Sequence, residues 1–309
     1  MSKKEDTGYN EELYTRFFKL VGTPDEGKKI SQSKAAQALG YSSGVISAYK
    51  SRSYNGNVRT LEEKIEAWLK REARRLEKVE IPTAETTVLD QVRRAVSIAQ
   101  DDADIAVIVG DAGTGKTTAL RRYEVESHSA FLVEVDPSFT KNVLVVEIAR
   151  AVGVDPKGGM TVVIGRIIDT LRERDAVLII DEADYLSDSS LELVRRIIND
   201  KAKTGVVLAG LPRLEYKLRN LRNDHEQLAS RVGVLLKVGR MNKADAVKIL
   251  SGVWKNLDKE AVNAFTAMAG GSVRTLVKLM GRVHQIMGIN RLENPDVDVV
   301  STAGELLMR

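Results

Sequence analysis

Asp104-Ile-Ala-Val-Ile-Val-Gly-Asp-Ala-Gly-Thr-Gly-Lys-Thr-Thr118 is the stretch that decides the fold of this chain. Its first part, Ile105 to Val109, is an apolar run rich in β-branched residues, which is typical of a strand buried on both faces of a parallel sheet. Glycines interrupt the run, and a helix-like stretch follows from Lys116. Strand, glycine loop and helix start fit the pattern G-x-x-x-x-G-K-[ST] between Gly110 and Thr117, which predicts a loop that binds nucleotide phosphates.

The residue types in this loop suit phosphate chemistry. A helix N-terminus offers unpaired N–H donors and the positive end of a dipole, and glycines let the backbone approach where a Cβ would clash. We expect Lys116 to reach the β- and γ-phosphates and the Thr117 hydroxyl to ligate Mg²⁺. The predicted nucleotide-binding residues are Gly110, Asp111, Ala112, Gly113, Thr114, Gly115, Lys116, Thr117 and Thr118.

A second apolar run, residues 176–180, ends in Asp181-Glu182-Ala183-Asp184. Ligands of open α/β sheets bind at the carboxyl edge of the strands, where these acids would lie. We expect Asp181 to hold Mg²⁺, directly or through water, and Glu182 to orient the attacking water. The sequence therefore predicts a nucleotide hydrolase.

The composition is that of an ordinary soluble chain, with 309 residues, 43% hydrophobic and 29% charged. No apolar run approaches the ~20 residues of a membrane span, and the N-terminus has no apolar signal region. The absence of cysteine excludes disulfides and thiol catalysis, and three scattered histidines disfavour a zinc site. We expect a cytoplasmic protein, and a net charge of +4 is compatible with nucleic-acid binding without showing it.

The N-terminal region, residues 1–78, predicts a helix-turn-helix domain. Short helices are expected over residues 31–39 and 42–50, with a turn at Gly40 between them. The exposed face of the second helix would present small polar and basic groups to DNA, so the predicted DNA contacts are Ser43, Ser47, Lys50 and Arg52. The alternative is a small helical domain that binds protein, or that binds nothing. Residues 79–87 are expected to form a linker.

The remaining chain predicts two further parts. Apolar runs at residues 130–135, 206–209 and 232–238 alternate with amphipathic helices, so residues 88–240 are expected to form a mostly parallel, three-layer α/β sheet. Residues 241–309 predict helices only and are assigned to a separate helical domain.

These parts, in this order, resemble an AAA+ ATPase with a helical lid. Gly271 to Leu276 resembles the lid's sensor-2 motif, which implies that Arg274 reaches the γ-phosphate. Arg231 resembles the arginine finger that acts on the nucleotide of a neighbouring subunit, with Arg219 and Arg222 as rivals. Leu211 stands where the family usually has a polar sensor-1 residue. Since leucine cannot hydrogen-bond phosphate or water, we expect slow hydrolysis that depends on DNA or a partner.

Within AAA+, the whole layout resembles the transposition proteins of the phage Mu B, TnsC and TniB family. The segments that carry this resemblance are residues 44–47, 50–57, 67–68 and 206–210. It implies ATP and Mg²⁺ as cofactors, homo-oligomers or helical filaments on duplex DNA, delivery of target DNA to a transposase, and a location in a bacterial or phage-infected cell. Weak sequence preference follows if DNA is held by its phosphates. Predicted contacts from the core are Lys141, Lys157, Lys201 and Lys203.

Two other functions share these ATP-site residues. A helicase loader or replication initiator would bind a replicative helicase in place of a transposase. A DNA-binding regulator would use ATP as a switch with negligible turnover, and Leu211 is the feature that favours it.

Overall fold

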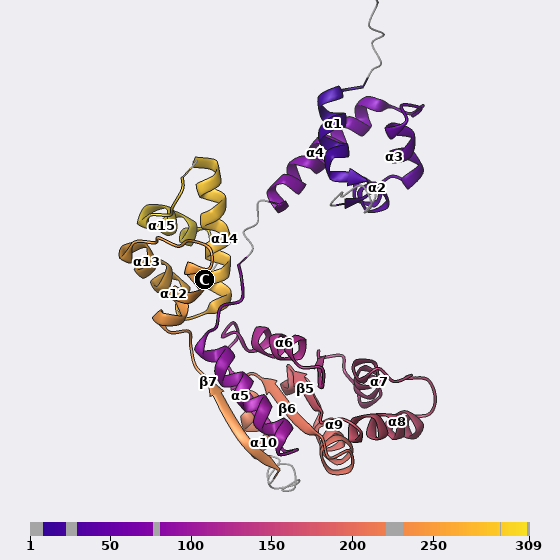
Figure 1. Cartoon of the computed structure of the whole chain (residues 1–309), viewed down its shortest axis with the longest axis vertical. Helices are drawn as coiled ribbons and strands as arrows, with labels where there is room; N and C mark the ends of the chain where they lie inside the picture. Colours follow the sequence, from indigo (N-terminus) through magenta and orange to yellow (C-terminus); the bar gives the residue numbers. More distant parts are fainter. Residues whose placement is uncertain (1–8, 23–29, 77–80, 221–230, 291, 308–309) are drawn as a thin grey trace, which may run out of the picture. The chain divides into compact units, whose positions relative to one another are not determined.

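The computed structural model describes residues 9–22, 30–76, 81–220, 231–290 and 292–307 (Figure 1). The chain divides into two compact units, residues 1–78 and residues 79–309. Among the described residues, no helix is long and apolar enough to cross a membrane.

The first unit is a small helical bundle. Its helices are α1 (Glu11–Leu20), α2 (Gln32–Leu39), α3 (Ser43–Lys50) and α4 (Val58–Leu76), and a two-residue parallel pair joins β1 (Val21–Gly22) to β2 (Ile30–Ser31). Gly40 ends α2 at φ 74°, a left-handed conformation that glycine adopts without a Cβ penalty. Phe17, Ile46 and Tyr49 are fully buried in its core. The two expected helices and their turn are present, whereas their contact with DNA stays a prediction.

The second unit contains a five-stranded, all-parallel sheet in the order β4-β5-β6-β3-β7. Its strands are β3 (Ile105–Gly110), β4 (Ala130–Glu134), β5 (Val177–Asp181), β6 (Gly205–Gly210) and β7 (Val232–Val238). Every residue of β3, β5 and β6 is buried, which explains why the sequence shows continuous apolar runs there. The predicted parallel sheet is thereby confirmed.

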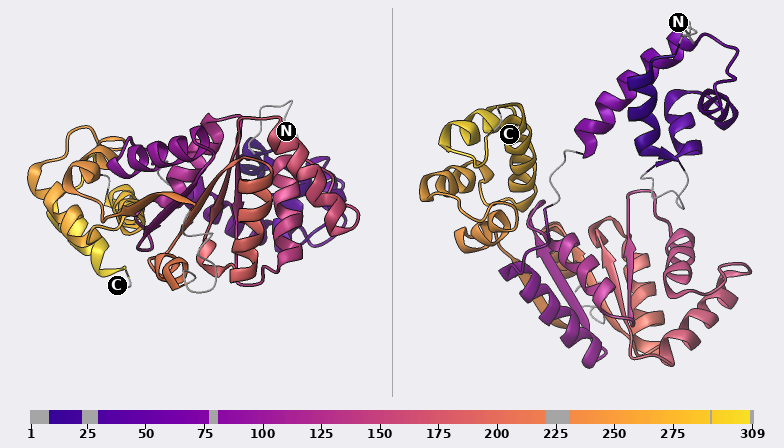
Figure 2. Two further views of the ribbon diagram at one scale, coloured as in Figure 1. Left: turned by 90° about the horizontal axis from the view of Figure 1, so that it is seen from below. Right: turned by 45° about the horizontal axis from the view of Figure 1, so that its top comes forward.

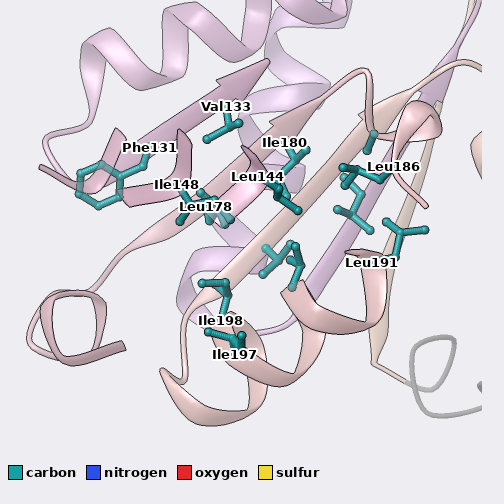
Figure 3. Packing of buried hydrophobic residues seen from close by; sticks show 14 of the residues in the cluster. Phe131, Val133, Leu144, Ile148, Leu178, Ile180, Leu186, Leu191, Ile197 and Ile198 are labelled. Atoms are coloured by element: carbon teal, nitrogen blue, oxygen red, sulfur yellow. The ribbon is translucent and has the colours of Figure 1, made fainter. Parts of the chain in front are cut away.

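Helices cover both faces of the sheet, which makes three layers (Figure 2). On one face lie α7 (Lys141–Val152), α8 (Met160–Arg172), α9 (Asp188–Val194), η3 (Arg195–Lys201) and α10 (Arg213–Asn220), and on the other α5 (Thr87–Asp101) and α6 (Lys116–Glu126). Strand β3 contributes Val107 to the first core and Ala106 and Ile108 to the second. Figure 3 shows the first core, where Leu144 and Ile148 of α7 pack against Leu178 and Ile180 of β5.

One element departs from regular α-helical geometry. Helix α9 passes into the π-helix η3 at Arg195. The buried guanidinium of Arg195 forms ion pairs with Glu192 and with Asp200, five residues further on. A π-helix aligns residues five apart, so this spacing suits the ion pair.

In the residues that the structure describes, the C-terminal part consists of four helices, which we call the lid: α12 (Lys243–Ser251), α13 (Lys259–Ala269), α14 (Val273–Asn290) and α15 (Val297–Glu305). It has its own core, which includes Phe265, Leu276 and Met280. The segment 81–86 packs against this core through Ile81 and Ala84. The backbone N–H and the hydroxyl of the next residue, Thr87, donate to Asp245 of α12 at 2.9 and 3.1 Å. The lid is therefore fastened to the start of α5.

Candidate nucleotide-binding site

A cavity of about 660 Å³ lies between the carboxyl edge of the sheet and the lid. It brings together residues from the glycine loop, from the ends of β5 and β6, and from α14. Its walls are formed by Ala112, Gly113, Gly115, Lys116, Thr117, Thr118, Glu182, Tyr185, Leu211, Val273, Arg274, Val277 and Lys278. Six of the nine predicted loop residues thus line the cavity directly.

The glycine loop encloses its own lysine. The Lys116 ammonium donates to the carbonyl oxygens of Gly110, at 2.6 Å, and Asp111, at 3.0 Å. Thr114 donates its hydroxyl to the same Asp111 carbonyl. Gly115 precedes α6 at φ 103°, a conformation open to glycine. Burial lowers the pKa of Lys116, while neighbouring carboxylates, Asp181 foremost, oppose that shift. Gly110 and Asp111 therefore contribute carbonyl groups that orient the lysine rather than line the cavity.

The two predicted metal ligands are in direct contact. The Thr117 hydroxyl donates to the Asp181 carboxylate at 2.6 Å, and the other Asp181 oxygen accepts the Glu182 N–H at 2.9 Å. One hydroxyl and one carboxylate at the cavity edge fit Mg²⁺, which is usually bound through few protein oxygens and completes its shell with water and substrate phosphates.

Glu182 has a strained backbone. Its φ is 57°, in the left-handed region that non-glycine residues seldom occupy, and such strain is often found at active sites. Burial raises the pKa of its carboxyl, and the nearby charges of Asp181 and Asp184 raise that pKa further. Glu182 reaches the cavity wall, as the proposed role of orienting water requires.

The lid contacts the glycine loop directly. The Arg274 N–H donates to the Gly113 carbonyl at 3.3 Å. A Cβ at Gly113 would lie 2.7 Å from the Ser272 hydroxyl, so a side chain at this position would push the lid away. Arg274 lines the cavity, as the sensor-2 resemblance implies. Lys278, one turn later, lines it too and was not predicted, although its i+4 spacing from Arg274 was a usable signal.

A second, mainly apolar cavity of about 230 Å³ adjoins the first. Gly115, Thr118, Val273 and Val277 line both cavities. The further walls come from the segment before α5, from α5 and α6, and from the lid: Ile81, Pro82, Thr83, Ala84, Thr86, Leu89, Thr114, Ala119 and Ile249. Thr114, Gly115 and Thr118 belong to the predicted glycine loop, but the cavity as a whole was not predicted, because the segment before α5 and the wall residue Ile249 carry no nucleotide motif.

An unpredicted group of polar contacts lies at the end of β6. Leu211 lines the cavity, as expected. Its backbone N–H donates to Asp184 at 3.1 Å, and the Arg213 guanidinium binds the same carboxylate at 2.6 Å.

Arg231 lies at the opposite edge of the sheet from the cavity. Its carbonyl accepts a hydrogen bond from the N–H of Ile105, the first residue of β3. The glycine loop lies at the other end of the same strand. Its guanidinium forms an ion pair with Asp200 at 3.3 Å. The rival Arg219 is paired with Glu215 in its own helix, and Arg222 lies outside the described residues.

The predicted DNA contacts of the first unit lie on α3 and just after it. Ser43 and Ser47 are exposed on α3. Arg52, by contrast, makes a two-pronged ion pair with Glu11 and lies over the Tyr14 ring, 4.4 Å from its centre. That arrangement gives Arg52 a structural role within the unit. Lys50 ends α3, with its ammonium 6.0 Å from the centre of the Phe18 ring.

The four lysines predicted to contact DNA from the second unit are all exposed, and they lie in two separate segments of the fold. Lys141 and Lys157 adjoin Asn142, Pro156 and Gly158, which line one small cavity beside α7 and α8. Lys201 and Lys203 instead precede the amino end of β6. Contact of these four lysines with DNA stays a prediction.

Comparison with known proteins agrees with the sequence motifs. Residues 99–218 match a family model described as an AAA domain. The Mu-like prophage FluMu DNA transposition protein B of Haemophilus influenzae is 29% identical over 262 residues, covering 81% of this chain and 90% of that protein. The ATP-dependent target DNA activator B of Escherichia phage Mu is 28% identical over 244 residues, covering 76% of this chain and 77% of the activator.

Solved structures show the same fold. The ORC2 protein of Aeropyrum pernix gives a TM-score of 0.58 at 15% identity, covering 76% of this chain and 72% of that one. The Thermotoga maritima RuvB Holliday junction branch migration motor gives 0.52 at 19% identity, covering 71% and 68%. The AAA+ P-loop fold and the resemblance to Mu-type transposition proteins B are therefore confirmed.

Proposed function

From the homology to Mu-type transposition proteins B, we propose that this chain is an ATP-dependent DNA-binding ATPase. It would assemble on duplex DNA, deliver that DNA as a target to a transposase, and stimulate the transposase. The observation that carries the proposal is the cavity in which Lys116, Glu182 and the lid residue Arg274 meet. The names of the relatives supply the connection to target DNA and ATP.

The paired cavities suit the two halves of ATP. The larger one, with Lys116, Arg274 and Lys278, offers positive charge and N–H donors to the phosphates. The smaller one, with Ile81 and Leu89 in its wall, offers an apolar enclosure for the base. Because the cavities share residues, a single ligand can occupy both.

The roles of the chain's residues follow from their positions. Thr117 and Asp181 would hold Mg²⁺, which when bound neutralises charge that builds up on the phosphates. Lys116 would leave the loop carbonyls and bind the phosphates. Glu182 would accept a hydrogen bond from the attacking water and orient it. Leu211 cannot add a hydrogen bond from the end of β6, which supports slow turnover in the absence of DNA or a partner.

The position of Arg231 supports an oligomeric active form. An arginine at the amino edge of the sheet cannot reach the nucleotide at the carboxyl edge of the same chain. If Arg231 stabilises the transition state, it does so in a neighbouring subunit, so the active form is an oligomer. In a filament of this kind, duplex DNA is held by its phosphates and sequence preference is weak. Ser43 and Ser47 of α3 and the pair Lys141 and Lys157 are the proposed DNA contacts.

Electron microscopy of the protein with plasmid duplex DNA tests this proposal. Filaments that form on DNA of arbitrary sequence with ATP, and not with ADP, are expected. Glu182→Gln should bind ATP and form filaments that persist, since it lacks the group that orients water. Discrete particles at a single site, or assembly that ignores the nucleotide, would instead favour a loader or a regulator.

A further inference from the structure

Asp184 is a carboxylate buried completely within the ATPase core. Its side chain has an exposed fraction of 0%, although it lies only two residues beyond Glu182. Ionised groups are seldom buried unless they are paired, because removing them from water costs free energy. The pairing comes from the end of β6: Leu211 donates its N–H to Oδ1, and Arg213 donates Nε and Nη2 to Oδ2 at 2.6 and 2.5 Å.

The chain backbone accommodates this carboxylate closely. A Cβ at Gly210 would lie 2.3 Å from Asp184 Oδ1, so no side chain fits there without displacing the carboxylate. Gly210 is the last residue of β6, and Asp184 lies in the short 3₁₀ turn η2 (Ala183–Tyr185) after β5. The carboxylate therefore joins the ends of two neighbouring strands at the edge where the nucleotide cavity opens.

Arg213 extends this connection to the cavity wall. Its guanidinium lies over the Tyr185 ring, 4.8 Å from the ring centre. Tyr185 and Leu211, the two residues that Arg213 and Asp184 hold, line the cavity beside Glu182. The Tyr185 N–H in turn donates to the Glu182 carbonyl at 3.0 Å. Arg213 and Asp184 thus lie directly behind three wall residues without lining the cavity themselves.

The strained turn at Glu182 needs such support. A left-handed glutamate backbone persists only where its surroundings fix it. The strands are already joined by their backbone ladder and by apolar packing, so the sheet does not require a buried ion pair at this place. The pair is placed where it fixes the Glu182 turn against Leu211, the position that lacks a polar side chain.

We propose that Arg213 and Asp184 are positioning residues for ATP hydrolysis, which hold Glu182 and the end of β6 in the arrangement that a polar residue at position 211 would otherwise fix. The proposal rests on the proposed ATPase function. It predicts an effect on the chemical step that greatly exceeds any effect on ATP binding, because neither residue touches the cavity.

Steady-state ATP hydrolysis with duplex DNA, together with binding of a fluorescent ADP analogue, tests the proposal. Arg213→Ala should lower kcat about tenfold, while KM and the ADP affinity change by less than about twofold. Arg213→Lys keeps a positive charge near Asp184 but loses the planar guanidinium and its stacking on Tyr185. Its kcat should therefore lie between those of the wild type and Arg213→Ala.

Arg196→Ala is the matched control. The Arg196 side chain is 66% exposed, compared with 55% for Arg213, and it too binds a carboxylate, Glu192, that is largely shielded from water. This variant should keep the wild-type kcat. A wild-type kcat in Arg213→Ala would overturn this inference but leave the proposed ATPase function standing. Loss of ADP binding and of thermal stability in parallel with kcat also overturns it, since that result indicates a merely structural pair. A wild-type protein without hydrolysis overturns the proposed function and this inference together.

Discussion

Arg231 provides the most discriminating test, because the fold prevents it from acting within its own chain. Its carbonyl accepts a hydrogen bond from Ile105, the first residue of β3. The glycine loop starts at Gly110, the last residue of the same strand. Five steps along a strand of about 3.3 Å per residue separate the two positions by about 17 Å. An extended arginine side chain cannot span that distance. If Arg231 contributes to hydrolysis, it therefore does so at a neighbouring subunit.

Mixing two inactive variants measures this directly. Arg231→Ala lacks the finger but has an intact nucleotide site, and its turnover should fall at least about 1,000-fold. Glu182→Gln has the finger but cannot orient water. In a randomly mixed oligomer a competent site needs the first variant to supply the nucleotide site and the second to supply the arginine. Equal amounts should therefore restore about one quarter of wild-type turnover, since each requirement is met half of the time.

Phosphate release from the mixture with duplex DNA is the assay, and each variant alone is the control. A mixture no faster than the mean of its two components would show that Arg231 is not used between subunits. Full activity in Arg231→Ala alone would show that another residue is the finger. The reasoning from strand direction would then be refuted for this site.

Three further outcomes are expected. Leu211→Asn should raise phosphate release without DNA by about tenfold, since it restores a hydrogen-bonding group at the cavity, and an unchanged rate would show that position 211 does not limit turnover. Arg195 lowers the pKa of Glu192 to about 2, so the Glu192 carboxylate stabilises the fold above its ordinary pKa near 4.5, and this contribution is lost as the pH falls towards 2. Glu192→Gln should therefore cost about 2 kcal/mol in urea unfolding at pH 7 and about half of that or less at pH 3. Gly205→Ala should cost about 2 kcal/mol in the same assay, because its Cβ would lie 2.2 Å from a backbone carbonyl oxygen at the end of α5, whereas Gly165→Ala, with open space around it, should stabilise by about 0.5–1 kcal/mol.

The parts of the fold that were predicted depend on local patterns. Strands buried on both faces must be continuously apolar, so residues 105–109, 177–180 and 206–209 were recognisable without any knowledge of their neighbours. The glycine loop was recognisable because phosphate requires Gly115, Lys116 and a helix start in a fixed order. Asp181, which accepts a hydrogen bond from Thr117 of the loop, ends a strand with the same apolar signature.

The parts that were missed depend on contacts distant in sequence. Nothing in the local sequence indicates that Asp184 is buried, because its partner Arg213 lies 29 residues away, at the start of α10 after β6. The apolar cavity was missed for the same reason. Ile81 and Ile249 both line it, but one precedes all five strands of the sheet in the sequence and the other follows them. Even Arg52, basic and exposed by position, is paired with Glu11, 41 residues before it. Composition alone cannot distinguish such a structural arginine from one that binds phosphate.

The placement of Asp184 also accounts for how the chain tolerates leucine at position 211. A polar side chain at the end of β6 would normally satisfy or orient nearby polar groups, and leucine offers none. Here the Leu211 backbone N–H is satisfied by the Asp184 carboxylate, and the charge of that carboxylate is balanced by Arg213. These bonds order the end of β6, and neither Asp184 nor Arg213 lines the nucleotide cavity. Structural order and catalytic contact, which one polar residue could provide together, are separated in this chain, and we therefore expect ATP to be hydrolysed slowly.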